Sequence, residues 1–195
     1  MLALVAILLL QAVPVRGELA VTGGGGLTSD TYGFGPHLSG RLELFERDVD
    51  GGLVASYWGR LLWFPGFEIF WGHEHHLSVR YAFRWFSVGL EAELRNIYYF
   101  TNGEWGAPHR LHFGAGPSIG VLAFDDGLFR LEGTVSYLPL ATTFDPHRLS
   151  ATVDFSWRSF TVRALGGLGG AGMYRPSPPF VMPHLGLYVG WRTTW

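Results

Sequence analysis

A run of histidine and glutamate, His73-Glu74-His75-His76, is followed by Ser78 and is the segment best suited to chemistry. In an extended strand alternate residues share a face, so His73 and His75 point one way and Glu74, His76 and Ser78 the other. Two imidazoles at this spacing suit Zn, Cu or Ni. A third ligand would come from another segment. The candidates are His109, His147 and His184. The alternative is a polar rim where a strand leaves an apolar environment.

The opposite face of the same strand offers an arrangement for nucleophilic catalysis. His76 and Ser78 are expected to lie beside Glu93 of the next strand. A base, a hydroxyl and an orienting carboxylate on one face are the groups that acyl transfer requires. The segment therefore predicts either a metal site, a hydrolytic site or a polar rim.

Strands of about ten residues must position these side chains, because apolar and polar residues alternate along most of the chain. Short and long connections between the strands also alternate, which predicts a closed antiparallel up-and-down transmembrane β-barrel. Eight strands is the alternative count. The ten predicted segments are 18–28, 35–46, 52–63, 75–84, 86–99, 109–124, 128–140, 148–157, 160–172 and 183–195.

The last strand, Leu185 to Trp195, alternates most strictly. Its apolar face ends on an aromatic residue and includes Leu187, Val189, Trp191 and Trp195. This ending resembles the C-terminal strand of bacterial outer-membrane β-barrels. The resemblance implies an outer-membrane location and recognition of these four residues by the barrel-assembly machinery.

Within that class, the segment Leu77 to Arg95 is similar to the lipid A deacylases, which use a His and a Ser two residues apart and a carboxylate on an adjacent strand. The resemblance implies that His76, Ser78 and Glu93 would be the catalytic residues of such a hydrolase. No cofactor is expected.

Composition narrows the class of protein. The formal net charge is −2 without a basic stripe, which argues against a nucleic acid partner. Cysteine is absent, so a disulfide framework and thiol catalysis are excluded. Only 15% of the residues are charged and none is lysine, too few to cover a soluble β-sandwich or a lipocalin-like barrel.

Residues 1–17 are predicted to be a cleaved secretory signal, because Leu2–Leu10 is an apolar run too short to span a bilayer. A buried N-terminal helix is the alternative. Residues 18–195 would then form the barrel, with both termini in the periplasm. The expected partners are outer-membrane lipid and lipopolysaccharide, with an apolar ligand or a protein at the apolar outer loop Trp63–Trp71.

The face opposite to lipid carries most strand charges and is expected to form an ion-paired lumen network. Its members are Arg41, Glu43, Arg80, Glu91, Glu93, Arg95, Arg130, Glu132, Asp154, Arg163 and Arg192. Arg60 and Arg84 fall on the same face. A tight turn near Trp85 would place Arg80 opposite Glu91. This pattern predicts a plugged barrel with a structural or surface-interaction role; the alternative, based on surplus arginine, is a narrow anion-preferring channel.

Overall fold

The computed structural model describes residues 15–28, 31–44, 51–64, 70–101, 104–105, 112–138, 148–170 and 181–195. Within these ranges the regular elements are strands. They are β1 (Val15–Thr28), β2 (Thr31–Leu44), β3 (Gly52–Phe64), β4 (Phe70–Phe83), β5 (Phe86–Thr101), β6 (Glu104–Trp105), β7 (His112–Asp125), β8 (Phe129–Leu138), β9 (Arg148–Trp157), β10 (Phe160–Gly170) and β11 (Val181–Thr194). The described residues contain no helix of the length and apolarity needed to cross a membrane.

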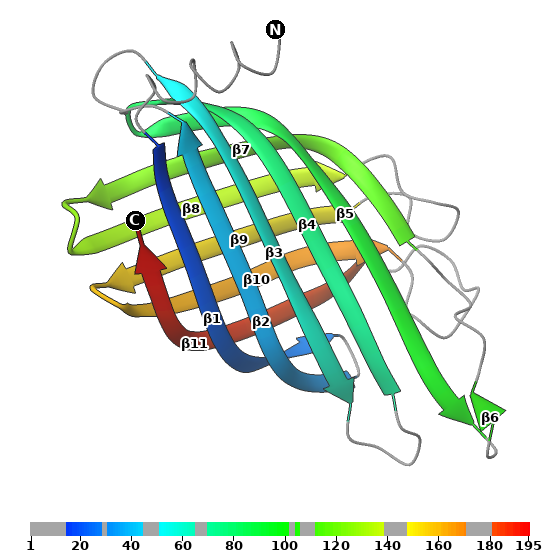
Figure 1. Cartoon of the computed structure of the whole chain (residues 1–195). Coiled ribbons are helices and arrows are strands. Elements are labelled where there is room, and N and C mark those ends of the chain that lie inside the picture. The colour runs from blue at the N-terminus through cyan, green and yellow to red at the C-terminus, as the bar shows by residue number, and fades with distance from the viewer. Residues whose placement is uncertain are drawn as a thin grey trace, which may run out of the picture.

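The strands form a closed antiparallel barrel (Figure 1). Its ring order is β4-β3-β2-β1-β11-β10-β9-β8-β7-β5, and pairing of β4 with β5 closes it. Among the described residues, the two-residue strand β6 pairs with the end of β5. The predicted all-β up-and-down barrel is therefore confirmed with ten strands in the ring, rather than eight.

Short turns and the C-terminal residue lie at the same end of the barrel, here called the turn end; the opposite end is the loop end (Figure 1). The β4–β5 and β9–β10 turns consist of two residues each, and their first residues, Arg84 and Arg158, have φ of 39° and 52°. Between β7 and β8, Asp126 accepts hydrogen bonds from the backbone N–H groups of Leu128 and Phe129, which holds its pKa below the ordinary value.

Strand β1 begins at Val15, three residues before the predicted start of the barrel at residue 18. Gly17 and Trp195 exchange backbone hydrogen bonds of 2.9 and 3.0 Å, which join the first and last strands at the turn end. A Cβ atom on Gly17 would lie 2.2 Å from the Trp195 ring, so a larger residue here would force this exposed ring to move. Residues 1–14 lie outside the described residues, and the signal peptide stays a prediction.

The predicted pairing of Arg80 with Glu91 is wrong. The register places Arg80 opposite Gly89 and Ser78 opposite Glu91, because Phe83 pairs with Phe86 across the turn. The turn therefore lies at Arg84-Trp85, one position earlier than the predicted pairing needs. In a hairpin the turn sets the register, so a shift of one position in the turn moves every pair by two residues.

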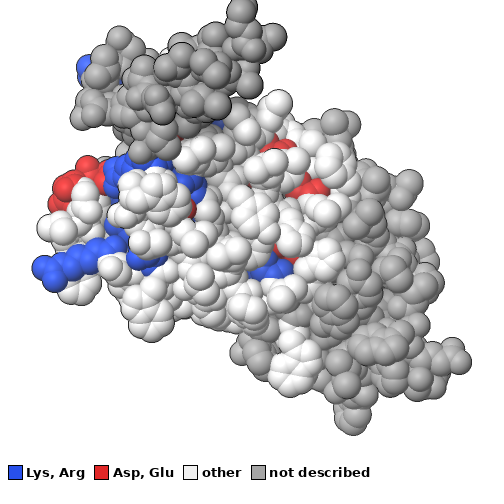
Figure 2. Space-filling model, viewed as in Figure 1, with Lys and Arg blue, Asp and Glu red and all other residues white. Residues whose placement is uncertain are grey.

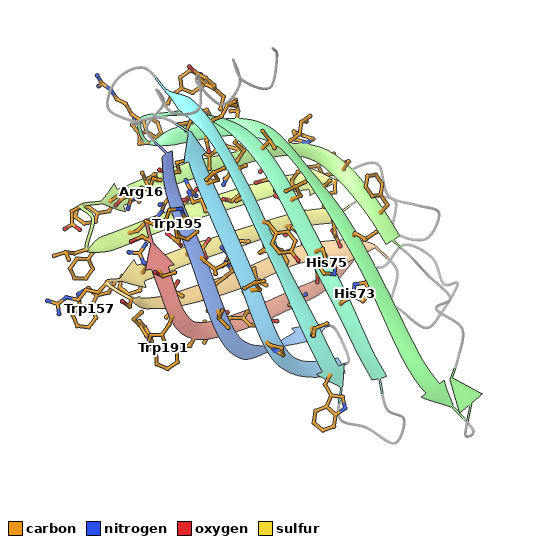
Figure 3. The ribbon with its side chains drawn as sticks, viewed as in Figure 1. Arg16, His73, His75, Trp157, Trp191 and Trp195 are labelled. Atoms are coloured by element: carbon orange, nitrogen blue, oxygen red, sulfur yellow. The ribbon has the colours of Figure 1, made fainter. Side chains whose placement is uncertain are left out.

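The two faces of the strands differ sharply in polarity. Many apolar side chains of the strands are exposed, for example Leu77 at 55%, Leu90 at 68% and Ile119 at 49%, whereas Arg80, Glu91 and Glu132 are 3–6% exposed. Figure 2 shows one side of the barrel as mostly uncharged, with charged atoms gathered toward the turn end. Figure 3 shows Trp157 and Trp191 projecting outward near that end. The charged side chains thus lie inside and the apolar side chains outside.

Candidate functional site

Five side chains inside the barrel form the turn-end network: Arg41, Glu43, Arg80, Arg130 and Glu132. Arg41 Nε lies 2.7 Å and Arg130 Nη2 lies 2.9 Å from Glu43 Oε1. Glu132 contacts three arginines, with Arg130 Nη2 at 2.8 Å, Arg80 Nη2 at 3.4 Å, and Arg41 Nη1 also donating. Each carboxylate therefore has at least two guanidinium partners, which offsets the cost of burying it.

The turn-end network crosses the lumen. Alternation places Arg41 and Glu43 on the inner face of β2, and Arg130 and Glu132 on the inner face of β8. Strands β2 and β8 are five positions apart in the ring of ten, so they form opposite walls. The Arg41–Glu132 and Arg130–Glu43 pairs consequently join these walls.

Two further ion pairs line the remaining walls. Arg192 Nη1 lies 3.0 Å from Glu18 Oε2, joining β11 to β1, and Arg192 Nε donates to the Arg158 carbonyl oxygen at 2.8 Å. Arg163 makes a two-point contact with Asp154 on the neighbouring strand β9, at 2.5 and 2.9 Å. The two-point contact fixes the orientation of the Arg163 guanidinium relative to the Asp154 carboxylate.

A second group, the loop-end cluster, consists of Arg60, Glu74, His76, Glu91 and Glu93, all less than 7% exposed. His76 Nδ1 lies 2.6 Å from Glu91 Oε1, and its Nε2 lies 2.8 Å from Glu74 Oε1. Arg60 contacts the other oxygen of Glu74 at 2.6 Å. The Ser136 hydroxyl donates to the second oxygen of Glu91. One imidazole therefore bridges two carboxylates.

Aromatic rings pack against the loop-end cluster. The His76 ring stacks on Trp58 at 3.7 Å between centroids and 9° between planes. The ring centroid of His37 lies 5.6 Å from that of Trp58 and 4.9 Å from that of Tyr188. The Tyr188 hydroxyl accepts a hydrogen bond of 2.9 Å from Arg60 Nη1. Tyr188 is 0% exposed. Trp58, Tyr188 and Leu165 form a cluster of buried side chains, here called the aromatic layer.

A small cavity lies between the turn-end network and the aromatic layer. Its volume is about 50 Å³, and its wall includes Trp58, His76, Arg80 and Glu132. Serine and threonine supply much of the remaining lining, from Ser39, Ser56, Ser78, Thr134, Ser136, Ser150, Thr152 and Ser156. A polar space of this size holds roughly three or four water molecules.

The structure brings His76 and Glu93 together but gives Ser78 another partner. Ser78 Oγ lies 2.6 Å from Ser56 Oγ. Both ring nitrogens of His76 contact carboxylates, so no nitrogen is left to accept a proton from Ser78. Glu93 lies opposite His76 in the register, and the imidazole forms ion pairs with Glu74 and Glu91. This geometry lacks the base–hydroxyl contact that nucleophilic catalysis uses.

His73 and His75 lie on the outside of β4, as the alternation predicts (Figure 3). Their ring centroids are 5.0 Å apart, and His75 Nδ1 lies 2.7 Å from the Tyr57 hydroxyl. The suggested third ligands His109 and His147 lie outside the described residues, as does the side chain of His184. Strand β11, which carries His184, is four positions from β4 in the ring. The metal-ligating role of this outer pair stays a prediction.

The inner charges differ from the predicted set. Among described side chains, seven arginines (Arg16, Arg41, Arg60, Arg80, Arg130, Arg163 and Arg192) face eight carboxylates (Glu18, Glu43, Glu74, Glu91, Glu93, Asp125, Glu132 and Asp154). Arg84 is an exposed turn residue, and the side chain of Arg95 lies outside the described set. The surplus of arginine that suggested an anion channel is therefore absent from the described part of the lumen.

Sequence reasoning did not include Glu18, Glu74, His37 and Tyr188 in the lumen network. Glu18 and Tyr188 fall on the inner face by simple alternation, so that pattern could have included them. His37 follows Pro36 in a glycine-rich strand, where the alternation is weak.

The predicted assembly-signal residues lie on the outer face of β11. Leu187, Val189, Trp191 and Trp195 are 55%, 41%, 74% and 67% exposed. Their exposure leaves this strand face accessible, while its other face contributes Tyr188 and Arg192 to the interior. Recognition by an assembly machinery stays a prediction.

Comparisons with known proteins give only weak matches. No family model and no curated protein matches the chain. A solved structure of Neisserial surface protein A (NspA) has 11% identity and a TM-score of 0.37, covering 92% of this chain and 96% of that one. The N-terminal β-barrel domain of Pseudomonas aeruginosa OprF has 12% identity and a TM-score of 0.31, with 92% and 97% covered.

A third solved structure is Ail, the attachment invasion locus protein of Yersinia pestis, in complex with the heparin analogue sucrose octasulfate. It has 12% identity and a TM-score of 0.34, with 92% of this chain and 97% of that chain covered. Values this low carry no argument about function, which must be based on the barrel itself.

Proposed function

We propose that the chain is an integral outer-membrane β-barrel with a plugged lumen and a structural or surface-interaction role. The supporting observation is its inverted polarity: exposed aliphatic and aromatic residues surround a barrel whose interior contains paired charges. In water this distribution is unfavourable, because burial of charge costs free energy and exposed apolar surface gains none. In a bilayer, a closed barrel with an apolar exterior satisfies both requirements.

The plug is proposed from two consecutive barriers. The turn-end network joins opposite walls through β2 and β8, and the aromatic layer places the buried side chains of Trp58, Leu165 and Tyr188 inside the barrel. The cavity beside them has a volume of about 50 Å³, sufficient for a few waters. Transport is therefore the less favoured role, and contact through the surface loops is favoured.

Membrane integration is tested by expressing the full chain and washing the isolated cell membranes at alkaline pH, which should leave the protein in the membrane fraction. The purified protein should float with liposomes, and it should migrate faster on a gel before heating than after heating. Recovery in the aqueous fraction without detergent would contradict the proposal.

The enzymatic alternative needs a separate test. Mass spectrometry of lipid A from cells that express the chain should show an unchanged acyl pattern. If lipid A loses one acyl chain in cells with the wild-type protein but keeps it in cells with Ser78→Ala, the deacylase alternative is established and a purely structural role is overturned.

A further inference from the structure

We propose that the loop-end cluster is a binding site for one divalent transition-metal ion, with Zn²⁺ as the preferred probe. The atoms that bind the metal would be His76 Nε2, a Glu74 oxygen and a Glu93 oxygen. One ligand atom from each of these three side chains lies within 4.8 Å of the others, and all three side chains are buried. One imidazole nitrogen and two carboxylate oxygens form a donor set that Zn²⁺ accepts.

Register explains why three separate donors meet. Glu74 and His76 are alternate residues of β4 and therefore share the inner face. Glu93 of β5 lies directly opposite His76. Because directly opposed residues on one face are the closest neighbours between strands, the fold brings the third donor to the other two.

Hydrogen bonds and ring stacking from neighbouring side chains orient these donors, as second partners of the ligands do in known metal sites. His76 Nδ1 lies 2.6 Å from Glu91 Oε1, so a neutral imidazole donating there would present Nε2 to a metal. Arg60 contacts Oε2 of Glu74 and leaves Oε1 directed toward the imidazole. Stacking on Trp58 fixes the plane of the ring. Glu91 and Arg60 would thus hold the ligands without binding the metal themselves.

With both carboxylates ionised, the contacts at His76 fit two states. Either the imidazole is protonated and donates to both Glu74 and Glu91, or it donates to Glu91 and binds a metal ion at Nε2. A metal ion would displace one proton and complete its coordination with water from the adjoining cavity, which His76 also lines. The second state is the one assigned to the loop-end cluster.

The site differs from the histidine pair that the sequence first suggests. His73 and His75 face outward, whereas His76 and its carboxylates face the lumen. The two sets can therefore be altered independently on the same strand, which provides a matched control.

The test uses the full barrel refolded in detergent, stripped with a chelator and titrated with ZnCl₂ by calorimetry. One Zn²⁺ ion per chain should bind. Co²⁺ bound at the same site should give visible d–d absorption typical of a low coordination number. Glu93→Gln should abolish both signals, and Glu91→Gln should weaken binding by about 10–100-fold. The double variant His73→Gln, His75→Gln should bind like wild type.

Absence of Zn²⁺ binding and of the Co²⁺ spectrum in heat-modifiable, hence folded, wild type would overturn the proposal and leave the protonated ion triad. Loss of binding only in the outer double variant would also overturn it, by assigning the metal to His73 and His75. Glu93→Gln keeps the size of the side chain, so this variant is expected to fold. Its heat-modifiable migration on a gel checks that it does. The measurement does not depend on whether the barrel conducts, and a failed metal test leaves the proposed membrane role intact.

Discussion

The two ends of the lumen bury charge in different ways. In the turn-end network, Glu132 and Glu43 are each shared by at least two arginines from different strands. In the loop-end cluster, a single imidazole bridges two carboxylates and stacks on an aromatic ring. The first arrangement is an ion-paired brace across the barrel. The second is a cluster whose charge balance depends on one proton or one cation. Substitutions in the two regions should therefore have different consequences.

The largest effect is expected for Glu132→Ala. Three buried arginines lose a common partner, and breaking a buried ion pair costs about 3–5 kcal/mol. The free energy of unfolding, measured with urea in detergent by tryptophan fluorescence, should fall by that amount. Arg84→Ala, which changes an exposed turn residue, is the control and should stay within about 0.5 kcal/mol of wild type. A loss below about 1 kcal/mol for Glu132→Ala would indicate a hydrated network rather than a brace.

A smaller loss is expected for His76→Leu. Arg60 still pairs with Glu74 and Ser136 still donates to Glu91, so the remaining imbalance should cost about 1–3 kcal/mol. Adding Glu91→Leu should recover part of the loss, because one unbalanced carboxylate is then removed. The same urea unfolding gives the coupling energy. Strictly additive losses would show that His76 and Glu91 do not interact.

The hydroxyl of Tyr188 makes a weaker contribution. Tyr188→Phe removes the hydrogen bond from Arg60 and keeps the ring that fills the aromatic layer. A loss of about 0.5–1.5 kcal/mol is expected, the usual net contribution of one hydrogen bond, because Arg60 keeps its contact with Glu74. Unfolding in urea measures this difference directly. A stability above wild type would mean that the hydroxyl is not a partner of Arg60.

The smallest effect concerns Asp126, which lies in a turn outside both regions. Its pKa is held below 3.8 by the N–H groups of Phe129 and Leu128, so its carboxylate stabilises the fold above that pH. This stabilisation should be lost as the pH falls through the lowered pKa. In Asp126→Asn the corresponding acid-dependent change in the unfolding midpoint should be absent. An unchanged acid profile would show that interior carboxylates alone control it.

Strand periodicity predicted the fold well because every strand has two different surroundings. The segments 148–157 and 160–172 nearly coincide with β9 and β10, where apolar residues such as Val153 and Phe155 alternate with Asp154 and Ser156. The predicted outer faces of β4 and β5 are also confirmed by the exposure of residues such as Val79 and Leu90.

The candidate site was harder to predict because it depends on register and on distant strands. Arg84 occupies a positive-φ position, where glycine, asparagine or aspartate is the usual signal, so the turn could not be located to one residue. Arg41 and Glu132 are in contact although they are separated by 91 residues in the sequence. No local sequence pattern indicates this contact. Face alternation predicts which charges enter the lumen, but it does not specify their partners.

Planar-bilayer recording of the purified wild-type barrel tests the central claim, that the lumen is closed at two consecutive levels. The account predicts insertion without a stable open conductance, and the double variant Trp58→Ala, Glu132→Ala should conduct because both barriers are weakened. A steady conductance of wild type would contradict the plugged lumen. Anion selectivity of that conductance would establish the channel alternative.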